Sequence, residues 1–273
     1  MSRHYQRLPF RIGATSMVFG EDLSENVRIL SDLVDHVEIV LFHTPTLHNI
    51  PGPREIRILK KIGEEKNVTF TVHLPASLEI ASPRKRTRCE SVQLTRDLFA
   101  KTSELNPLHY ILHIPFSPPT LVPVPGLYFT KQNPRTWDEW TSRTLDSLET
   151  LHEEIGGNNT LLVENINYSP SFLEPFWKRG LCGLCLDLGH LILGKEKVLA
   201  AIRHYIDVIK VIHIHGVRGY EEHLSLSVLP EKRVLKWLEF LTKVPFKGVI
   251  LLEVFTPQDL KESTDIVFQD SQY

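Results

Sequence analysis

Residues of the types that bind metal ions recur where the apolar segments of this sequence end. They are His73, His113, Glu164, Asp187, His190, His213, His215, His223 and Glu253. A lone histidine at such a place is more often a satisfied core or surface residue than a ligand. The carboxylates say more, because Glu164, Asp187 and Glu253 each follow three or more apolar residues, and burying an unpaired carboxylate costs several kcal/mol. The apolar segments supply almost no Lys or Arg, Lys210 being an exception, so a metal cation is the expected counter-charge.

The ligand types narrow the choice of metal. Mixed imidazole and carboxylate ligands suit Zn²⁺, with Mn²⁺ and Fe²⁺ as alternatives, and argue against Ca²⁺ and Mg²⁺. Clustered divalent ions activate water as a nucleophile and stabilise charge on the attacking and leaving oxygens, which is the chemistry of phosphoester hydrolysis. We therefore expect Glu164, Asp187 and Glu253 to be the catalytic residues of a metal-dependent hydrolase.

Eight apolar segments, separated by amphipathic ones, must position these residues. Strands are expected at 10–16, 37–42, 68–74, 110–114, 160–165, 183–188, 208–215 and 248–254, and helices at 23–33, 53–66, 89–103, 137–155, 195–204 and 231–242. Apolar strands that alternate with helices predict a parallel sheet buried on both faces. Eight such units in 273 residues predict a closed (β/α)8 TIM barrel, with its active site at the C-terminal ends of the strands. An open doubly wound sheet is the alternative, but no Gly-rich phosphate turn follows the first strand.

We expect one domain over residues 1–273, with one departure from the alternation. Residues 115–136 form a Pro-rich, partly apolar insertion after the fourth strand. A loop of this length at the C-terminal end of a barrel strand is either a lid over the active site or an idle insertion. Residues 268–273 are polar and are expected to fray.

Composition excludes several classes of protein. Apolar residues make up 42% and charged residues 23% of the chain, and the net charge is −2. This balance makes nucleic acid an improbable partner, since duplex-binding proteins usually carry a basic excess. Cys89, Cys182 and Cys185 make no disulfide framework and are expected to be reduced structural thiols in a cytoplasmic protein. No secretory signal and no apolar stretch of the ~20 residues needed to cross a membrane is evident.

The order of candidate ligands resembles that of the xylose isomerase-like barrel superfamily, whose endonuclease IV branch binds three zinc ions. The resemblance implies one ion at His73, His113 and Glu164, a second at Glu164, Asp187, His213 and Glu253, and a third at His190, Glu221 and His223. Glu164 would bridge the first two ions, and Glu222 is the alternative to Glu221. The sugar isomerases and epimerases of the superfamily keep mainly the second set. His213 is preferred over His215 because HIHGV aligns with the His-x-x-Asp pattern of the family, with Gly216 in place of the Asp.

The sequence around these ligands resembles one branch more closely. RIGATS, VEIVLF, TVHLP, YILHI, CLDLGHLIL, IHIHGVRGYEEH and LLEVF, from about Phe10 to Phe255, are similar to the cobamide-remodelling phosphodiesterases. The resemblance implies hydrolysis of the phosphoester linkage in the nucleotide loop of an adenosylated cobamide, which releases a cobinamide-type corrinoid. HLSLSVL departs from the Gly-rich turn of many superfamily members.

Three further residues are weaker candidates for substrate contacts. His215 shares a strand face with His213, since side chains alternate along a strand. Arg218 follows the seventh strand and is placed to contact a phosphate oxygen. Glu38 lies within the second strand, where it either supports a ligand or pairs with Lys210.

Three other functions remain as alternatives. An apurinic endonuclease would share the metal set but needs a basic track for DNA. A sugar isomerase or epimerase would use one metal and two carboxylates, and would not need His73, His113 or His190. A non-catalytic corrinoid- or metal-binding protein would bind tightly without turnover.

Overall fold

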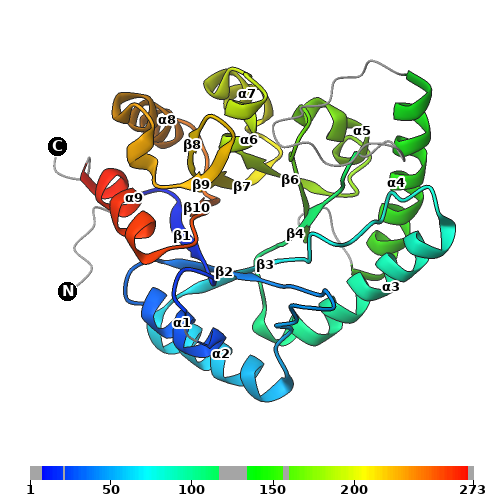
Figure 1. Ribbon diagram of the computed structural model, residues 1–273, viewed down its shortest axis with the longest axis horizontal. Helices are drawn as coiled ribbons and strands as arrows, with labels where there is room; N and C mark the ends of the chain where they lie inside the picture. Colours follow the sequence, from blue (N-terminus) through cyan, green and yellow to red (C-terminus); the bar gives the residue numbers. More distant parts are fainter. Residues whose placement is uncertain (1–7, 21, 117–133, 156–159, 270–273) are drawn as a thin grey trace.

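The computed structural model describes residues 8–20, 22–116, 134–155 and 160–269, and its strands close into a barrel ringed by helices (Figure 1). The barrel strands are β1 (Arg11–Thr15), β2 (His36–Val40), β3 (Thr69–His73), β4 (Tyr110–His113), β5 (Leu161–Glu164), β6 (Gly183–Asp187), β7 (Ile209–Ile214) and β10 (Val249–Leu252). Around the barrel the order is β1-β10-β7-β6-β5-β4-β3-β2, with parallel pairing throughout. The predicted (β/α)8 TIM barrel is confirmed.

Helices follow the strands and cover the outside of the barrel (Figure 1). They are α1 (Leu23–Leu30), α2 (Pro53–Lys66), α3 (Lys85–Thr102), α4 (Pro134–Ile155), α5 (Glu174–Trp177), α6 (Leu188–Leu193), α7 (Val198–Tyr205), α8 (Glu231–Lys243) and α9 (Pro257–Gln269). Short 3-10 turns lie at Ser103–Leu105, Pro170–Leu173 and Leu226–Val228. Local chemistry fixes several ends. Asp22 accepts the backbone N–H of Glu25 at the start of α1, and Asn67 takes a left-handed conformation after α2.

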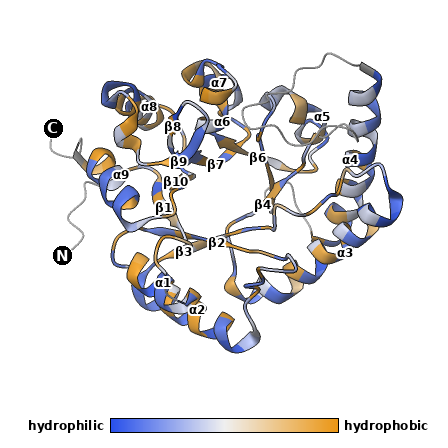
Figure 2. Cartoon of the chain, viewed as in Figure 1, coloured by the Kyte–Doolittle hydropathy of each residue, from blue (hydrophilic) through white to orange (hydrophobic). Residues whose placement is uncertain are grey.

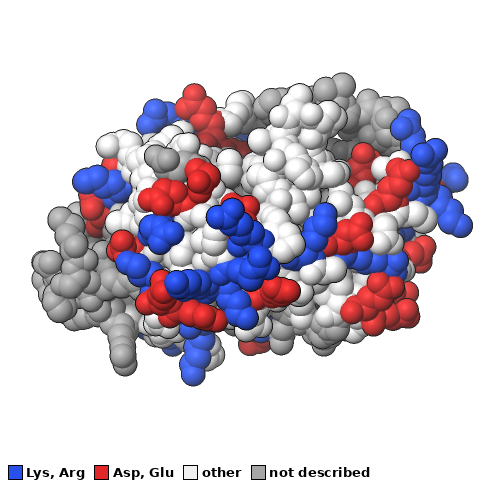
Figure 3. All heavy atoms as spheres, turned by 90° about the horizontal axis from the view of Figure 1, so that it is seen from below, with Lys and Arg blue, Asp and Glu red and all other residues white. Residues whose placement is uncertain are grey.

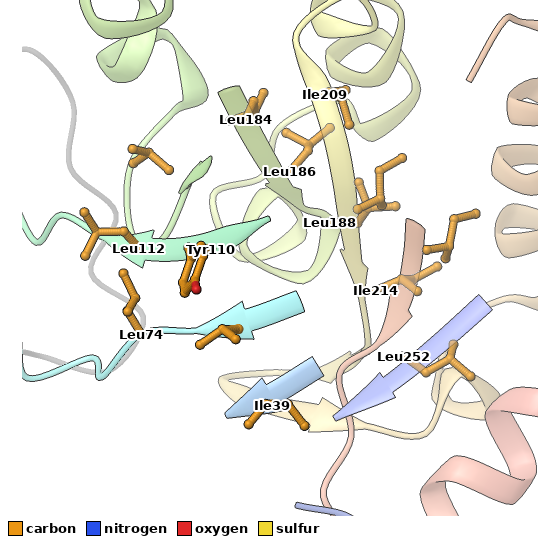
Figure 4. Close-up of a cluster of buried hydrophobic side chains, with 14 of the residues drawn as sticks. Ile39, Leu74, Tyr110, Leu112, Leu184, Leu186, Leu188, Ile209, Ile214 and Leu252 are labelled. Carbon is orange, nitrogen blue, oxygen red and sulfur yellow. The ribbon is translucent and has the colours of Figure 1, made fainter. Parts of the chain in front are cut away.

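Apolar side chains form two separate clusters because strand residues alternate between the two faces of the barrel wall. The larger cluster lies between strands and helices, and Figure 4 shows part of it, including Leu112, Leu186 and Ile214. The smaller one fills the barrel interior with Ile111, Leu162, Cys185, Val211, Val249 and Leu251. Hydropathy follows the same division, with the strands largely hydrophobic and hydrophilic residues frequent on the outer turns of the helices (Figure 2).

The opposite side of the barrel interior is polar. On β2 and β3 the inward positions hold His36, Glu38, Thr69 and Thr71, and Thr15 joins them from β1. All except Thr69 are at most 2% exposed. The barrel is therefore packed with apolar side chains on the β4–β10 side and with hydrogen-bonding side chains on the β1–β3 side.

Several predicted elements differ from the observed ones. The sixth strand ends at Asp187, because the Asp187 side chain accepts the backbone N–H of His190 and so begins α6 at Leu188. The helix predicted from Lys195 begins at Val198, since Lys195 adopts φ 56°. The hairpin of β8 (Gly216–Arg218) and β9 (Glu221–Leu224), and the helix α9, were not predicted. The sequence of α9 has few apolar residues, although Leu260 and Val267 are buried.

Two predicted segments lie partly or wholly outside the described residues. Of the Pro-rich insertion at 115–136, residues 117–133 are not described, so its role as a lid stays a prediction. The predicted frayed tail at 268–273 begins too early, since α9 runs through Gln269, and residues 270–273 lie outside the description.

The face that carries α1 and α2 shows Lys and Arg interspersed with Asp and Glu (Figure 3). Lys66 Nζ lies 2.7 Å from Asp32 Oδ1, and Arg28 Nε lies 3.2 Å from Glu25 Oε2. This face therefore carries charges of both signs. In the part of the chain that the structure describes, no helix is long and apolar enough to cross a membrane.

Leu162→Ala tests the interior apolar cluster. Leu162 is 0% exposed, so its truncation is expected to lower the free energy of unfolding by about 2–5 kcal/mol through lost burial and a residual cavity. Urea denaturation of the metal-free protein measures this. The control is Leu108→Ala, at a side chain that is 41% exposed. Equal losses in the two variants would contradict the assignment of Leu162 to the barrel core.

Candidate metal centre

The candidate ligands meet at the C-terminal mouth of the barrel because parallel strands end together there. His73, His113, Glu164 and Asp187 are the last residues of β3, β4, β5 and β6, His213 lies near the end of β7, and Glu253 directly follows β10. Strand register places His113 opposite Glu164 and Asp187 opposite His213. Each also stands two residues beyond an interior residue of its own strand, so its side chain points into the barrel.

The first group consists of His73, His113 and Glu164. His73 Nε2 and His113 Nε2 lie 3.3 and 3.2 Å from the same oxygen, Glu164 Oε2. The two imidazole rings meet edge to face, with centroids 4.7 Å apart. His73 Nδ1 lies 2.9 Å from the carbonyl oxygen of Leu74. A ligating histidine typically donates one ring N–H to such a carbonyl and presents its other nitrogen to the metal.

The second group gathers Glu164, Asp187, His213 and Glu253, whose ligand atoms all lie within 4.8 Å of one another. His213 Nδ1 lies 3.4 Å from both Glu164 Oε2 and Glu253 Oε2. Its other nitrogen, Nε2, lies 3.4 Å from Glu38 Oε2. Glu38 thus faces the barrel, as predicted, and its partner on β7 is His213 rather than Lys210.

The spacing of these atoms fits a metal better than direct hydrogen bonds. Charge-assisted N–H···O bonds are about 2.7–2.9 Å long. Four ligands about 2.1 Å from a tetrahedral Zn²⁺ lie roughly 3.4 Å from one another. The nitrogen-to-oxygen distances around Glu164 are 3.2, 3.3 and 3.4 Å. Imidazole and carboxylate are spaced here as ligands around a shared ion would be.

Unpaired buried atoms give the same indication. Five buried atoms have no hydrogen-bond partner among the residues that the structure describes: Glu164 Oε1, Asp187 Oδ2, His213 Nδ1, His215 Nε2 and Glu253 Oε2. Buried polar atoms are nearly always hydrogen-bonded in folded proteins. Five unpaired atoms at one barrel mouth therefore fit the residues to a divalent metal with nitrogen and oxygen ligands.

The pKa shifts in this region come from the same crowding. Burial alone would raise the pKa of Glu164, but His213 and His113 hold it well below its usual value. Burial alone would lower the pKa of His73, but its contact with Glu164 and the charge of Glu38 raise it to about 9. Asp187 raises the pKa of His215 to about 9 against the effect of burial. Without metal, protons supply the positive charge that these carboxylates need.

The third predicted group is more open than the other two. Glu222, rather than Glu221, faces it: its carboxylate oxygens lie 3.9 Å from His190 Nδ1 and 3.9 Å from His223 Nε2. Glu221 is exposed on β9. His223 adopts φ 57°, a conformation uncommon outside glycine, and its Nδ1 lies 3.6 Å from Glu253 Oε2. We therefore prefer Glu222 to Glu221 as the acidic member of this group.

The weaker candidates for substrate contact, His215 and Arg218, differ in their exposure to solvent. His215 is fully buried, with Nε2 3.3 Å from Asp187 Oδ2 and Nδ1 3.0 Å from the backbone nitrogen of His223. It has no exposed surface for the substrate contact that the sequence suggested. A Cβ on Gly189 would lie 2.0 Å from this ring, so residue 189 must be glycine. Arg218 is exposed on β8, and its contact with a phosphate stays a prediction.

Two functional positions were missed from sequence. The side-chain amide of Asn165 accepts the backbone N–H of Asp187 at 2.9 Å and donates to the Asp187 carbonyl at 3.0 Å, which fixes the end of β6. Its place directly after Glu164 was the available signal. Cys185 lies beside Glu164 and His213, and burial raises the pKa of its thiol well above the usual value. It was predicted only as a structural thiol.

Glu164→Ala tests the shared carboxylate. Losing an outer hydrogen-bond partner of a metal ligand typically lowers metal affinity roughly 10–100-fold. The Glu164 variant is expected to lose more affinity than this, because two ligand groups lose a member. Elemental analysis after dialysis, together with chelator competition, measures this. Glu149→Ala, at a surface residue paired with Arg179, is the control. Full metal content in the Glu164 variant would refute the shared role.

Stability of the metal-free protein should depend on pH. His73 and His215 have pKa values raised from 6.5 to about 9, so their stabilising contribution is full below pH 6.5 and is lost as the pH rises through 9. With a chelator present, the melting temperature is expected to fall over this range. With metal, the fall should shrink, because metal binding strengthens as the ligands lose protons. Calorimetry measures the melting temperature against pH in both conditions. Identical profiles with chelator and with metal would contradict metal binding by these residues.

Comparison with known proteins agrees with the barrel fold. The family described as "Xylose isomerase-like TIM barrel" matches residues 27–270. A D-tagatose 3-epimerase-like protein superposes with TM-score 0.75 at 23% identity, covering 94% of this chain and 96% of that one. The 3-keto-D-glucoside 4-epimerase from E. coli superposes with TM-score 0.67 at 14% identity, covering 94% of this chain and 97% of that one. An AP endonuclease of family 2 from Brucella melitensis superposes with TM-score 0.59 at 12% identity, covering 96% of this chain and 98% of that one. A search of curated proteins finds no match. The chain belongs to the xylose isomerase-like TIM barrel family.

Proposed function

We propose that this protein is a metal-dependent phosphoester hydrolase that uses at least two neighbouring divalent ions. The observation that carries the proposal is the convergence of His73, His113 and His213 on one oxygen of Glu164, at 3.3, 3.2 and 3.4 Å. A single-metal sugar epimerase has no need of His73 and His113. Zn²⁺ suits the mixed nitrogen and oxygen ligands, and Mn²⁺ and Fe²⁺ are the alternatives.

Bound ions at this site would polarise a phosphoryl oxygen and activate water. The protein's own residues then divide the remaining tasks. Glu164, Asp187 and Glu253 keep the site anionic and would hold the ions. His190, Glu222 and His223 line its more open side, with side chains that are 14%, 31% and 27% exposed. If no third ion is bound, they would be free to transfer a proton to the leaving oxygen, since their partial exposure lets them reach both substrate and solvent.

For the substrate, we propose the nucleotide loop of a cobamide, with a cobinamide-type corrinoid as product. The support is the resemblance of the segments around the ligands to the cobamide-remodelling phosphodiesterases, together with exposed apolar side chains near the mouth. Phe255, which follows β10, is 41% exposed, with its ring 4.9 Å from that of His223, and Tyr220 is 73% exposed in the β8–β9 turn. A corrinoid is large and largely uncharged, and aromatic side chains suit such a surface.

A sugar epimerase is the second candidate function. It is favoured by the compact group of Glu164, Asp187, His213 and Glu253, which could hold one metal ion and contains three carboxylates. Several solved structures with this fold are titled as ketose or keto-sugar epimerases. This candidate predicts that His73→Ala leaves catalysis intact.

The test compares substrates and variants together. The metal-loaded protein is incubated with an adenosylated cobamide, with D-tagatose or D-psicose, and with a duplex containing an abasic site at low salt. We expect loss of the cobamide lower ligand. We expect His73→Ala and Glu164→Ala to reduce this activity at least about 100-fold, since losing only an outer hydrogen-bond partner of a metal ligand typically costs about 10–100-fold.

The other outcomes overturn the proposal in different ways. Ketohexose epimerisation that survives His73→Ala would replace it with the epimerase. Cleavage of the abasic duplex without cobamide turnover would replace it with an endonuclease. Tight binding of a corrinoid without any turnover would leave a binding protein. His152→Ala, on α4 away from the strand ends, is the matched control for loss of a histidine.

A further inference from the structure

A continuous chain of buried and partly buried hydrogen bonds runs through the polar side of the barrel interior toward His213. His36 Nδ1 lies 2.8 Å from Thr69 Oγ1, and His36 Nε2 lies 2.9 Å from Thr71 Oγ1. Thr71 Oγ1 donates to Glu38 Oε2 at 3.0 Å, and Glu38 Oε2 faces His213 Nε2 at 3.4 Å. The chain crosses from β2 to β3, returns to β2 and ends on β7.

The positions of the protons in this chain can be assigned. Ionised Glu38 only accepts, so the single hydroxyl proton of Thr71 goes to Glu38 and Thr71 Oγ1 must accept from His36 Nε2–H. Burial lowers the pKa of His36 to about 3, so His36 is neutral and its Nδ1 accepts from the hydroxyl of Thr69. Glu38 then accepts from His213 Nε2–H. Every donor in the chain has an acceptor, and Nδ1 of His213 is left facing Glu164 and Glu253.

We propose that His36 and Thr71 are positioning residues that hold Glu38 and thereby fix the ring orientation and tautomer of His213 for metal binding. Neither residue touches the site. Their effect passes through Glu38, as outer hydrogen-bond partners of ligating histidines are known to act. The inference rests on the metal centre of the proposed function and on no particular substrate.

Packing alone does not explain these residues. His36, Glu38 and Thr71 occupy inward-facing strand positions. On the other side of the barrel interior, the inward-facing positions hold apolar side chains such as Leu162, Val211 and Leu251, which pack together. Buried polar groups are costly unless fully paired, so apolar residues would fill this side more simply. The neighbouring strand also accommodates the chain, since a Cβ on Gly13 would lie 2.9 Å from His36 Cδ2. The interior is thus shaped around the His36 ring.

The test compares Thr71→Val, which keeps the shape and loses the hydroxyl, with Thr71→Ser, which restores the hydroxyl. Co²⁺ is titrated into metal-free protein and followed by its visible absorption, and affinity is measured by chelator competition. We expect Thr71→Val to weaken Co²⁺ binding about 10–100-fold and to change the absorption bands, and Thr71→Ser to stay close to the original protein. His36→Leu is expected to act in the same direction.

Thr95→Val is the matched control, because Thr95 is equally buried but its hydroxyl donates to the Ser91 carbonyl within α3. Its Co²⁺ affinity and spectrum should not change. Equal Co²⁺ binding by Thr71→Val and the original protein would overturn the inference, as would equal losses in Thr71→Val and Thr71→Ser. Failure of the original protein to bind Co²⁺ at all would instead overturn the metal centre, and the inference with it.

Discussion

Four carboxylates are buried inside one barrel, and this constraint shapes the rest of the site. Glu38, Glu164, Asp187 and Glu253 are at most 8% exposed, and burying such charges without compensation is prohibitive. Histidines from β3, β4 and β7 supply partial compensation. In the absence of metal, the neighbouring carboxylates raise the pKa values of His73, His213 and His215 against the effect of burial. Unpaired oxygens and nitrogens still remain. Divalent ions would supply the missing positive charge at the ligand groups, which is why we interpret the ring as a candidate metal centre.

The barrel interior is divided into an apolar side and a polar side, and the apolar packing offsets the cost of burying these charges. Apolar side chains from β4 to β10 supply the packing that stabilises the fold, while β2 and β3 carry His36, Glu38 and Thr71. Strand alternation puts these residues in the same inward rows as the ligands above them. A rigid set of hydrogen bonds beneath a metal site favours one geometry of the ligands, and this is the purpose that we propose for the polar wall.

The shared fold does not decide the reaction, since one barrel hosts many chemistries. What distinguishes the candidate functions is the number of ions that the side chains can hold. The group around Asp187 and Glu253 would serve an epimerase as well as a hydrolase. The group of His73 and His113 around Glu164 could hold a further ion, and it is the feature on which our proposal of phosphoester chemistry rests. Electrostatic stabilisation of a phosphoryl group benefits from several fixed positive charges.

The sequence by itself determined the barrel and the identity of most candidate ligands. Eight apolar runs, six of which carry His, Glu or Asp at or near their C-terminal ends, leave few other folds. The cost of burying Glu164 or Asp187 can be argued without coordinates. Tertiary structure alone decided the pairings. It showed that Glu38 meets His213 and not Lys210, that Glu222 and not Glu221 faces His190, and that His215 is enclosed. These choices depend on register, on the path of the β8–β9 hairpin and on the positive φ of His223. They join residues far apart in the chain, and no local pattern specifies them.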